Sequence, residues 1–213
     1  MIEKDSPSAL WMLQMAHQTK LIKDPSGKIL FFTDNFYTRH HLAHALNLIT
    51  HGEARMIGTV RLSLVDATNH YWLEEAVEII SKKKRGSWCL VRAYDEDPDL
   101  AMLQCRHQTQ NRGLPKSHRE RFIPPMDNIS PYAGYIVLLD KKVVIFYSND
   151  LNGTATEPIL HDSDGEAMNI CWGLCPIYRW TGKEIMTRSS FLVPTPIIAY
   201  NQYMGGIDRM DQL

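Results

Sequence analysis

The 213 residues are enough for one large domain, or for one domain with a sizeable insertion. Hydrophobic residues make up 44% and charged residues 22%, a balance that permits a buried core and argues against disorder. Lys and Arg number 23 against 24 for Asp and Glu, so the chain lacks the excess positive charge of a dedicated DNA-binding domain. Any contact with nucleic acid must therefore come from local patches.

Cysteine content and hydropathy indicate the compartment. Four cysteines in a chain of this length do not form the disulfide framework of a small secreted domain. The apolar stretch of residues 8–16 is interrupted by Gln14 and is too short to span a bilayer. We therefore expect an intracellular protein in a reducing compartment, with no membrane as a partner.

Hydrophobic periodicity predicts regular elements at the start of the chain. Apolar residues at three-residue spacing predict a helix over residues 8–19, and a turn containing proline and glycine separates it from an apolar strand over residues 29–33. A second helix is expected from Thr38, with its apolar face ending before Gly52, and a strand is expected over residues 55–64. This helix–strand–helix–strand order predicts an α/β fold with a parallel sheet.

The rest of the chain has a different pattern. Residues 63–188 are rich in prolines, and their clearest elements are two apolar strands, 134–139 and 143–147, which are joined as a hairpin. We expect this part to be an insertion richer in strands and loops. From residue 196 an apolar run leads to Gly205 and Gly206, a pair that we expect to turn the backbone before a short terminal helix.

Three carboxylates lie where a site is expected. Asp34 follows the strand of residues 29–33, and the C-terminal ends of parallel strands are where α/β proteins form sites suited to hard divalent cations. Asp208 and Asp211 are three residues apart, which places both on one helix face. Each also has an explanation without a metal. Asp34 and Asn35 can cap a turn, and the helix dipole stabilises acidic residues in a first helical turn.

The sharpest basic run consists of Lys82, Lys83, Lys84 and Arg85. It predicts contacts with phosphate groups or a nuclear address, and the alternative is a solvated loop. A second basic stretch, residues 116–121, is diluted by an acidic residue and is a weaker candidate for the same role.

Cysteine and histidine patterns give weaker signals. Three residues separate Cys171 from Cys175, a spacing compatible with zinc, although a buried cysteine that serves as a small hydrophobic residue is the alternative. The nearest candidates for a second ligand pair are Cys105, His107 and His161. His40 and His44 share a helix face but lack the glutamate of a metalloprotease motif, so we expect surface histidines.

Common catalytic motifs are absent, but four other motifs resemble those of a known family. There is no G-x-S-x-G elbow, Walker A loop or dinucleotide fingerprint, which disfavours hydrolase, kinase and oxidoreductase functions. In the same order as in piggyBac-type transposases, the chain has DNFYTR at 34–39 (DNFFTS in the family), GTVR at 58–61, LLDKKVV at 138–144 (WxDxKxV) and YNQYMGGIDRMDQ at 200–212 (YNxxMGGVDxxDQ). The chain thus resembles these transposases over nearly its whole length.

The resemblance implies a partial ribonuclease-H-like transposase catalytic core with a large insertion rich in β-strands and loops. Residues 1–62 would be the partial core, 63–190 the insertion and 191–213 the return to the core. In such a fold, three aspartates hold two Mg²⁺ ions, which activate water or a 3′-hydroxyl and stabilise the leaving oxygen on phosphorus. Asp34 would be the second aspartate, Asp208 the third and Asp211 an additional ligand.

The partner that the resemblance implies is DNA. The family cuts and rejoins transposon ends at TTAA-type targets in the nucleus, and a homodimer is expected for the full-length form. The residues that we expect to contact nucleic acid are Arg61, Lys82, Lys83, Lys84 and Arg85.

The chain departs from the family pattern at both ends. The first aspartate of the family is expected on a strand upstream of the helix over residues 8–19, and Asp5 is no substitute because no apolar run surrounds it. We therefore expect a truncated, transposase-derived fragment that does not cut DNA by itself, with Asp34 and Asp208 as its remaining catalytic residues. The alternatives are a non-catalytic module that binds DNA or protein, and a remnant without function.

Overall fold

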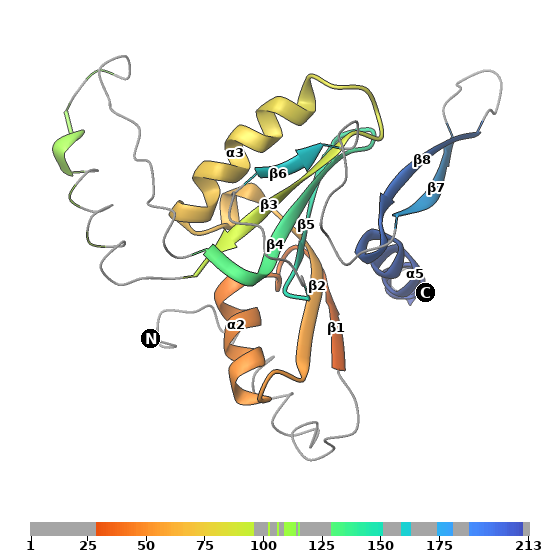
Figure 1. Cartoon of the computed structure of the whole chain (residues 1–213), viewed down its shortest axis with the longest axis horizontal. Helices are drawn as coiled ribbons and strands as arrows, with labels where there is room; N and C mark the ends of the chain where they lie inside the picture. Colours follow the sequence, from red (N-terminus) through yellow and green to blue (C-terminus); the bar gives the residue numbers. More distant parts are fainter. Residues whose placement is uncertain are drawn as a thin grey trace.

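The computed structural model describes residues 29–95, 102, 106, 109–113, 115, 129–150, 159–162, 174–180 and 188–210, of which 29, 67, 159–162 and 205–210 are described by their backbone alone. The helix predicted over residues 8–19 lies outside these ranges. The described chain is a mixed α/β fold, in which one sheet carries two helices on one face and a hairpin with a further helix on the other (Figure 1).

The main sheet has six strands in the order β1-β2-β5-β4-β3-β6. The strands are β1 Ile29–Thr33, β2 Ala54–Val60, β3 Trp88–Tyr94, β4 Ile129–Leu139, β5 Val143–Ser148 and β6 Ile159–Asp162. β1 and β2 are parallel, and every other neighbouring pair is antiparallel. Among the described strands, the expected parallel pairing is therefore limited to β1 and β2, where a helix returns the chain to the end of the sheet at which β1 began.

Helix α2, His40–Ile49, makes this crossover. It begins two residues after Thr38, and no side chain caps its N-terminus. Beyond its C-terminus, Gly52 has a φ angle of 88° and donates its backbone N–H to the carbonyl of Asn47 at 2.7 Å. Glycine adopts this left-handed conformation without strain. The strand–helix–strand order predicted for residues 29–64 is thus confirmed.

The hairpin predicted around residues 140–142 is also confirmed, since Leu139 of β4 pairs with Val143 of β5. Helix α3, Ala67–Ser81, lies in the part that was expected to be strands and loops. The carboxylate of Asp66 caps it by accepting a hydrogen bond from the N–H of Asn69 at 2.9 Å. Its buried residues have helical spacing and include Leu73, Ala76 and Ile80. The sequence therefore contains a signal for this helix, although strands and loops are expected in this part of the chain.

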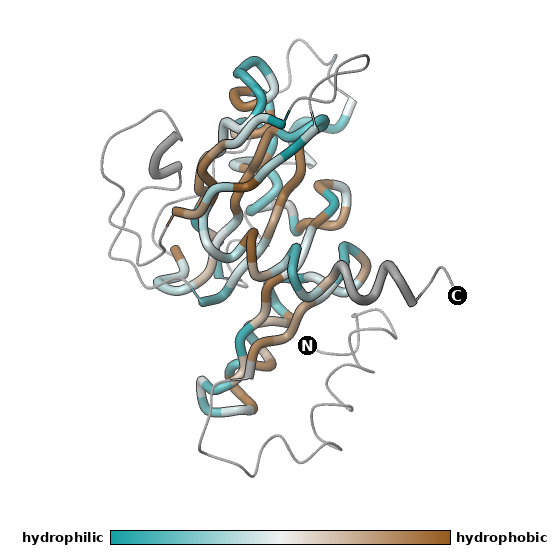
Figure 2. The backbone as a smooth tube through the Cα atoms, turned by 90° about the vertical axis from the view of Figure 1, so that its right-hand side faces the viewer, coloured by the Kyte–Doolittle hydropathy of each residue, from teal (hydrophilic) through white to brown (hydrophobic). Residues whose placement is uncertain are grey.

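One hydrophobic core lies between the sheet and the two helices α2 and α3. The helices contribute Leu42 and Leu46 from α2, and Leu73 and Ile80 from α3. Alternate residues of a strand face opposite sides of its sheet. On β3, the residues that face this core are therefore Cys89, Val91 and Ala93. Figure 2 shows the apolar segments concentrated along these central strands.

A second core lies on the opposite face of the sheet. It is covered by a two-stranded hairpin, β7 Leu174–Trp180 paired with β8 Arg188–Pro194, and by helix α5, Thr195–Met210. Trp88 and Leu90 of β3 pack in this core with Ile177, Val193 and Ile197. Figure 1 shows the hairpin extending away from the sheet, with α5 beneath it.

The sheet runs across the boundary expected at residue 62. Gly58 of β2 pairs with Tyr147 of β5, so strands from residues 1–62 and from residues 63–190 are hydrogen-bonded in one sheet. The division into core and insertion stays a prediction, but within the described residues these two parts share one sheet and the hydrophobic core between that sheet and helices α2 and α3.

The glycine pair near the C-terminus differs from the prediction. Gly205 and Gly206 lie inside α5, which begins ten residues earlier at Thr195, so they do not turn the chain before a helix. Each glycine costs about 1 kcal/mol in a helix. We attribute the continuity of the helix to tertiary packing upstream, where Ile197 and Met204 are buried. Among the described residues, no helix is long and apolar enough to cross a membrane.

Candidate functional site

Asp34 begins the turn that leaves β1. Its Oδ1 accepts hydrogen bonds from the backbone N–H groups of Phe36 (2.9 Å) and Tyr37 (3.3 Å), and its carbonyl accepts one from Thr38 Oγ1 at 2.6 Å. The side chain is exposed. Asp34 thus caps the turn, as the explanation without a metal supposes. Its second carboxylate oxygen accepts no hydrogen bond from the part of the chain that the structure describes.

The glycine of the GTVR motif packs against this turn. The hydroxyls of Thr33 and Thr38 are buried and 2.8 Å apart. A Cβ atom on Gly58 would overlap the hydroxyls of both threonines and would lie 2.6 Å from the carbonyl oxygen of Thr33. Only glycine fits there without displacing its neighbours. Two of the motifs found in the sequence therefore meet in space, and their contact fixes the backbone that presents Asp34.

Helix α5 crosses the sheet from β2 toward β1. The hydroxyl of Tyr200 lies 3.2 Å from Thr59 Oγ1 of β2, and the ring of Tyr203 lies 4.7 Å from that of Phe32 in β1, centroid to centroid. Asp208 follows on the same helix, roughly 7.5 Å beyond Tyr203 along the axis at about 1.5 Å per residue. The described backbone of α5 includes Asp208, whereas Asp211 lies outside the described residues.

An open groove of about 560 Å³ lies beside the Asp34 turn. Asn35 lines it at one end, and the exposed Arg61 lines it where β2 ends. Its other walls come from β2, from the segment that follows it, from α3 and from β5, and include Thr59, Ser63, Val77 and Val143. The groove thus joins the predicted nucleic-acid contact Arg61 to the neighbourhood of the predicted metal ligand Asp34.

The chemistry of the turn suits a hard cation only in part. Mg²⁺ prefers oxygen ligands, and Asp34 offers an exposed carboxylate oxygen at the end of a parallel strand. Within the described residues, however, no three His, Cys, Asp or Glu side chains converge as a metal site. The structure describes Asp208 by its backbone alone, and Asp211 lies outside the described residues. The convergence of Asp34, Asp208 and Asp211 on a metal ion therefore stays a prediction.

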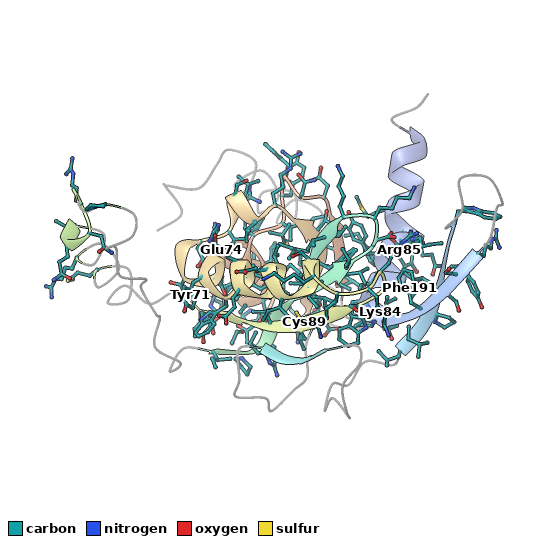
Figure 3. All side chains as sticks on the ribbon, turned by 90° about the horizontal axis from the view of Figure 1, so that it is seen from above. Tyr71, Glu74, Lys84, Arg85, Cys89 and Phe191 are labelled. Carbon is teal, nitrogen blue, oxygen red and sulfur yellow. The ribbon has the colours of Figure 1, made fainter. Side chains whose placement is uncertain are left out.

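The basic run between α3 and β3 divides into two roles. Lys82 pairs with Glu78 at 2.8 Å on the surface, and Lys82 and Lys84 are exposed. Arg85 instead makes a two-nitrogen contact with Oδ1 of Asp140, in the β4–β5 turn, and donates to the carbonyl of Trp180 at 3.1 Å. Figure 3 shows Lys84 and Arg85 beside Phe191 of the hairpin. Arg85 therefore connects the sheet to the hairpin.

Asp140 is the centre of this connection. Its Oδ2 accepts a hydrogen bond from Nε of Arg179 at 3.0 Å, so it is held by one arginine from the α3–β3 turn and one from β7. Burial alone would raise the pKa of Asp140, but the hydrogen bonds and charges of Arg85 and Arg179 outweigh it, and the pKa is lowered from 3.8. The ionised form is therefore the one that the folded state stabilises.

We expect Asp140→Asn to lower the free energy of unfolding by about 2 kcal/mol at pH 7, because it leaves two partly buried arginines without a counter-charge. A lowered carboxyl pKa stabilises the fold above pH 3.8 and ceases to do so as the pH falls through the folded-state pKa. The difference between wild type and variant should therefore shrink below pH 3.8, as measured by urea denaturation. Glu78→Gln, in an exposed pair, is the control and should cost less than about 0.5 kcal/mol. Equal losses in the two variants would contradict the role of Asp140.

The cysteines give no zinc site among the described residues. Cys175 is a half-buried free thiol on β7, whereas Cys171, Cys105 and His107 lie outside the described residues, and His161 is described by its backbone alone. The described residues thus leave both alternatives for Cys171 and Cys175 open, zinc binding and a cysteine that serves as a small hydrophobic residue. Cys89 is buried, and burial raises the pKa of its thiol to about 12, which makes it unreactive.

A histidine network on α2 corrects one expectation. His40 is buried: its Nδ1 lies 2.9 Å from the hydroxyl of Tyr147, and its Nε2 lies 3.0 Å from Oδ1 of Asp95. His44 is partly exposed, and its Nδ1 lies 2.8 Å from the hydroxyl of Tyr132. The expectation of surface histidines is therefore wrong for His40. The four-residue spacing signals a shared helix face, but only the fold shows that this face meets the sheet.

Comparison with family models, with curated proteins and with solved structures found no match to this chain. The motifs and the geometry that joins them are therefore the features that bear on function. The structure brings together the DNFYTR and GTVR motifs, and it packs the helix of the fourth motif against both strands.

Proposed function

We propose that this chain derives from a piggyBac-type transposase, with elements of a ribonuclease-H-like core and a metal site that includes Asp34 and Asp208. The observation that carries the proposal is the packing of α5, the helix that contains Asp208, against β1, the strand that leads into the Asp34 turn. A shared site requires that these two elements, separated by most of the chain, meet on the sheet. The parallel β1–α2–β2 unit, with a carboxylate at the end of its first strand, also supports the proposal.

In this proposal the chain's own residues position the reacting groups. Thr33, Thr38 and Gly58 fix the turn, and the two N–H groups that bind Oδ1 of Asp34 leave its other oxygen for a cation. Mg²⁺, when bound, would stabilise the charge that develops on the oxygens around phosphorus. Arg61 is exposed on the wall of the neighbouring groove, where it can contact a phosphate of the DNA strand.

Mn²⁺ binding tests the metal site. We expect Asp34→Asn to weaken binding of Mn²⁺ by about tenfold or more, because the amide cannot replace an anionic oxygen ligand. The amide oxygen of asparagine can still accept the two N–H groups of the turn, so the fold should persist. Titration of the 213-residue polypeptide, followed by the electron paramagnetic resonance of free Mn²⁺, measures the change. Asp208→Asn should have the same effect.

The control for this experiment is Asp150→Asn. Asp150 pairs with Arg55 at 3.2 Å, at the end of the sheet opposite to Asp34, and its loss should leave Mn²⁺ binding unchanged. Equal Mn²⁺ affinities for wild type, Asp34→Asn and Asp208→Asn would rule out the metal site. We also expect no nicking of supercoiled DNA by this polypeptide. Mg²⁺-dependent nicking that Asp34→Asn abolishes would overturn the expected lack of cleavage.

A non-catalytic DNA-binding module is the second candidate, and the basic residues around the α3–β3 turn favour it. Lys82, Lys84 and the lysines of the β4–β5 turn, Lys141 and Lys142, are exposed on neighbouring turns. DNA binding that falls steeply with salt and is indifferent to Asp34→Asn would select this candidate. In either case DNA is the proposed partner. On the resemblance to the family we further propose transposon ends and a TTAA-type target as the DNA, a homodimer and action in the nucleus.

A further inference from the structure

The β7–β8 hairpin has an apolar outer face that neither core of the protein covers. On β7 the residues that alternate with the buried side are exposed: Leu174 is 48% exposed, Tyr178 60% and Trp180 51%. Leu192 of β8, which pairs with Pro176, is 53% exposed on the same side. The opposite side of the hairpin packs on the sheet through Ile177 and Val193. A polar outer face would be expected for a hairpin that only covers a core.

The rings of Tyr178 and Trp180 dominate the half of this face that lies at the C-terminal end of β7. Tyr178 is paired across the hairpin with Ser190, a small residue that leaves the ring open to a ligand. Trp180 is paired with Arg188, and the guanidinium carbon of Arg188 lies 4.6 Å from the centroid of the indole. A guanidinium group that lies over an aromatic ring can itself stack on a planar ligand. Tyr178, Trp180 and Arg188 thus offer adjoining planar surfaces to solvent.

The surroundings of these rings are strongly basic. The backbone carbonyl of Trp180 accepts a hydrogen bond from Arg85, which brings the α3–β3 turn to the edge of the hairpin. Within the hairpin strands and residues 82–87 and 139–143, the acidic residue is Asp140, and two arginines neutralise its charge. The basic residues of these segments are Lys83, Lys84, Arg85, Lys141, Lys142, Arg179 and Arg188, together with Lys82, which pairs with Glu78 of α3. The positive charge around the rings suits a polyanion.

We infer that the outer face of the β7–β8 hairpin binds single-stranded DNA, with bases stacked on Tyr178 and on the Arg188–Trp180 pair and with phosphates held by the neighbouring lysines. Exposed rings beside a basic groove are the combination that proteins use for unpaired nucleotides, because every base has a face on which an aromatic ring can stack. In a duplex those faces are covered by neighbouring bases, so the rings favour the unpaired strand. The inference rests on the proposed function only in taking DNA as the partner.

The test compares two oligomers that have the same phosphates. We expect the 213-residue polypeptide to bind a fluorescein-labelled twelve-residue oligothymidylate about tenfold more tightly than an abasic oligomer of equal length, as measured by fluorescence anisotropy. The double variant Tyr178→Ala/Trp180→Ala should bind both oligomers equally weakly. The salt dependence of the double variant's affinity for DNA should be the same as that of the wild type, because the phosphate contacts remain. Trp180→Phe should restore part of the preference for the oligomer with bases.

The aliphatic residues of the same face provide the matched control. Leu174→Ala/Leu192→Ala removes comparable exposed apolar surface without removing a ring, and it should leave the preference for bases intact. An equal loss of this preference in the two double variants would overturn the inference, because the rings would then contribute no more than aliphatic surface. The wild type could instead dimerise in a concentration-dependent way that either double variant abolishes. That result would assign the face to a second copy of the chain and would also overturn the inference. Equal binding of the oligothymidylate and the abasic oligomer by the wild type would overturn the inference as well. Because the Mn²⁺ titration does not involve the hairpin, failure of the inference and failure of the proposed function give different results.

Discussion

Gly58→Ala is expected to lower the free energy of unfolding by about 3 kcal/mol, at the upper end of the range for overpacking a closely packed site. The backbone at Gly58 lies outside the left-handed region, so an alanine there is not strained by its own conformation. The cost comes from the new methyl group, which must displace the buried hydroxyls of Thr33 and Thr38 and the Thr33 carbonyl. Because a backbone atom is among them, a change of side-chain rotamer cannot relieve the overlap. Chemical denaturation followed by far-ultraviolet circular dichroism measures this loss.

The neighbouring residue serves as the control. Thr59→Ala removes one hydrogen bond to Tyr200, on the side of β2 that faces α5, and should cost only about 1 kcal/mol. A loss of less than 1 kcal/mol for Gly58→Ala would mean that the Asp34 turn is not packed against β2. Gly58→Ala should also abolish the binding of Mn²⁺ that depends on Asp34, because displacement of the two threonines moves the backbone that presents its carboxylate.

Gly86→Ala is expected to cost about 3 kcal/mol, for two reasons that can be separated. Gly86 has a φ angle of 94°, which disfavours alanine. A Cβ atom at this position would also lie 2.6 Å from Cγ and 2.7 Å from Cβ of Phe191, the residue through which β8 packs on the α3–β3 turn. The variant therefore combines backbone strain with a collision between the hairpin and the sheet. Equilibrium denaturation by urea gives the total cost.

Gly52→Ala isolates the first reason. Gly52 has a φ angle of 88°, and a Cβ atom there would have no neighbour within 4 Å, so its replacement should cost only the backbone strain of about 1 kcal/mol. Phe191→Ala combined with Gly86→Ala should recover part of the remaining difference by making room for the methyl group. Equal costs at Gly52 and Gly86 would contradict the close packing of the hairpin on this turn.

The parts of the fold predicted from the sequence are those specified by local pattern. The apolar run Ile29–Thr33, the helix ending before Gly52 and the β4–β5 hairpin each carry their signal within a short window, and all three are present. Helix α3 has such a signal in its Asp66 cap and in the helical spacing of its apolar residues, but the prolines from Pro98 onward led to strands and loops being expected for the whole of residues 63–188. The antiparallel pairing of β2 with β5 could not be predicted, because the sequence of neither strand indicates which distant strand it pairs with.

The candidate site divides in the same way. Asp34 could be located because it ends a strand, and its capping role follows from its residue type. The dependence of that turn on Gly58 requires a contact between two strands, which periodicity does not report. Arg85 looks like the lysines that precede it, and only the position of Asp140 shows that its charge is already paired. The outer rings of β7 are visible in the sequence as Tyr178 and Trp180, but their exposure follows from which side of the hairpin packs on the sheet.

The partner of β2 also determines the order in which the protein can fold. Ile57 pairs with Ser148, so β2 must wait for a strand that leaves the ribosome roughly ninety residues later, and closing so long a loop is slow. Until then one edge of the β1–β2 pair is open, with Met56 and Ile57 on a strand able to pair with another chain. The carboxylate turn is therefore formed early from local contacts, while the sheet that supports it is completed late. We therefore expect this architecture to be prone to aggregation while it is being synthesised, before β5 covers the edge of β2.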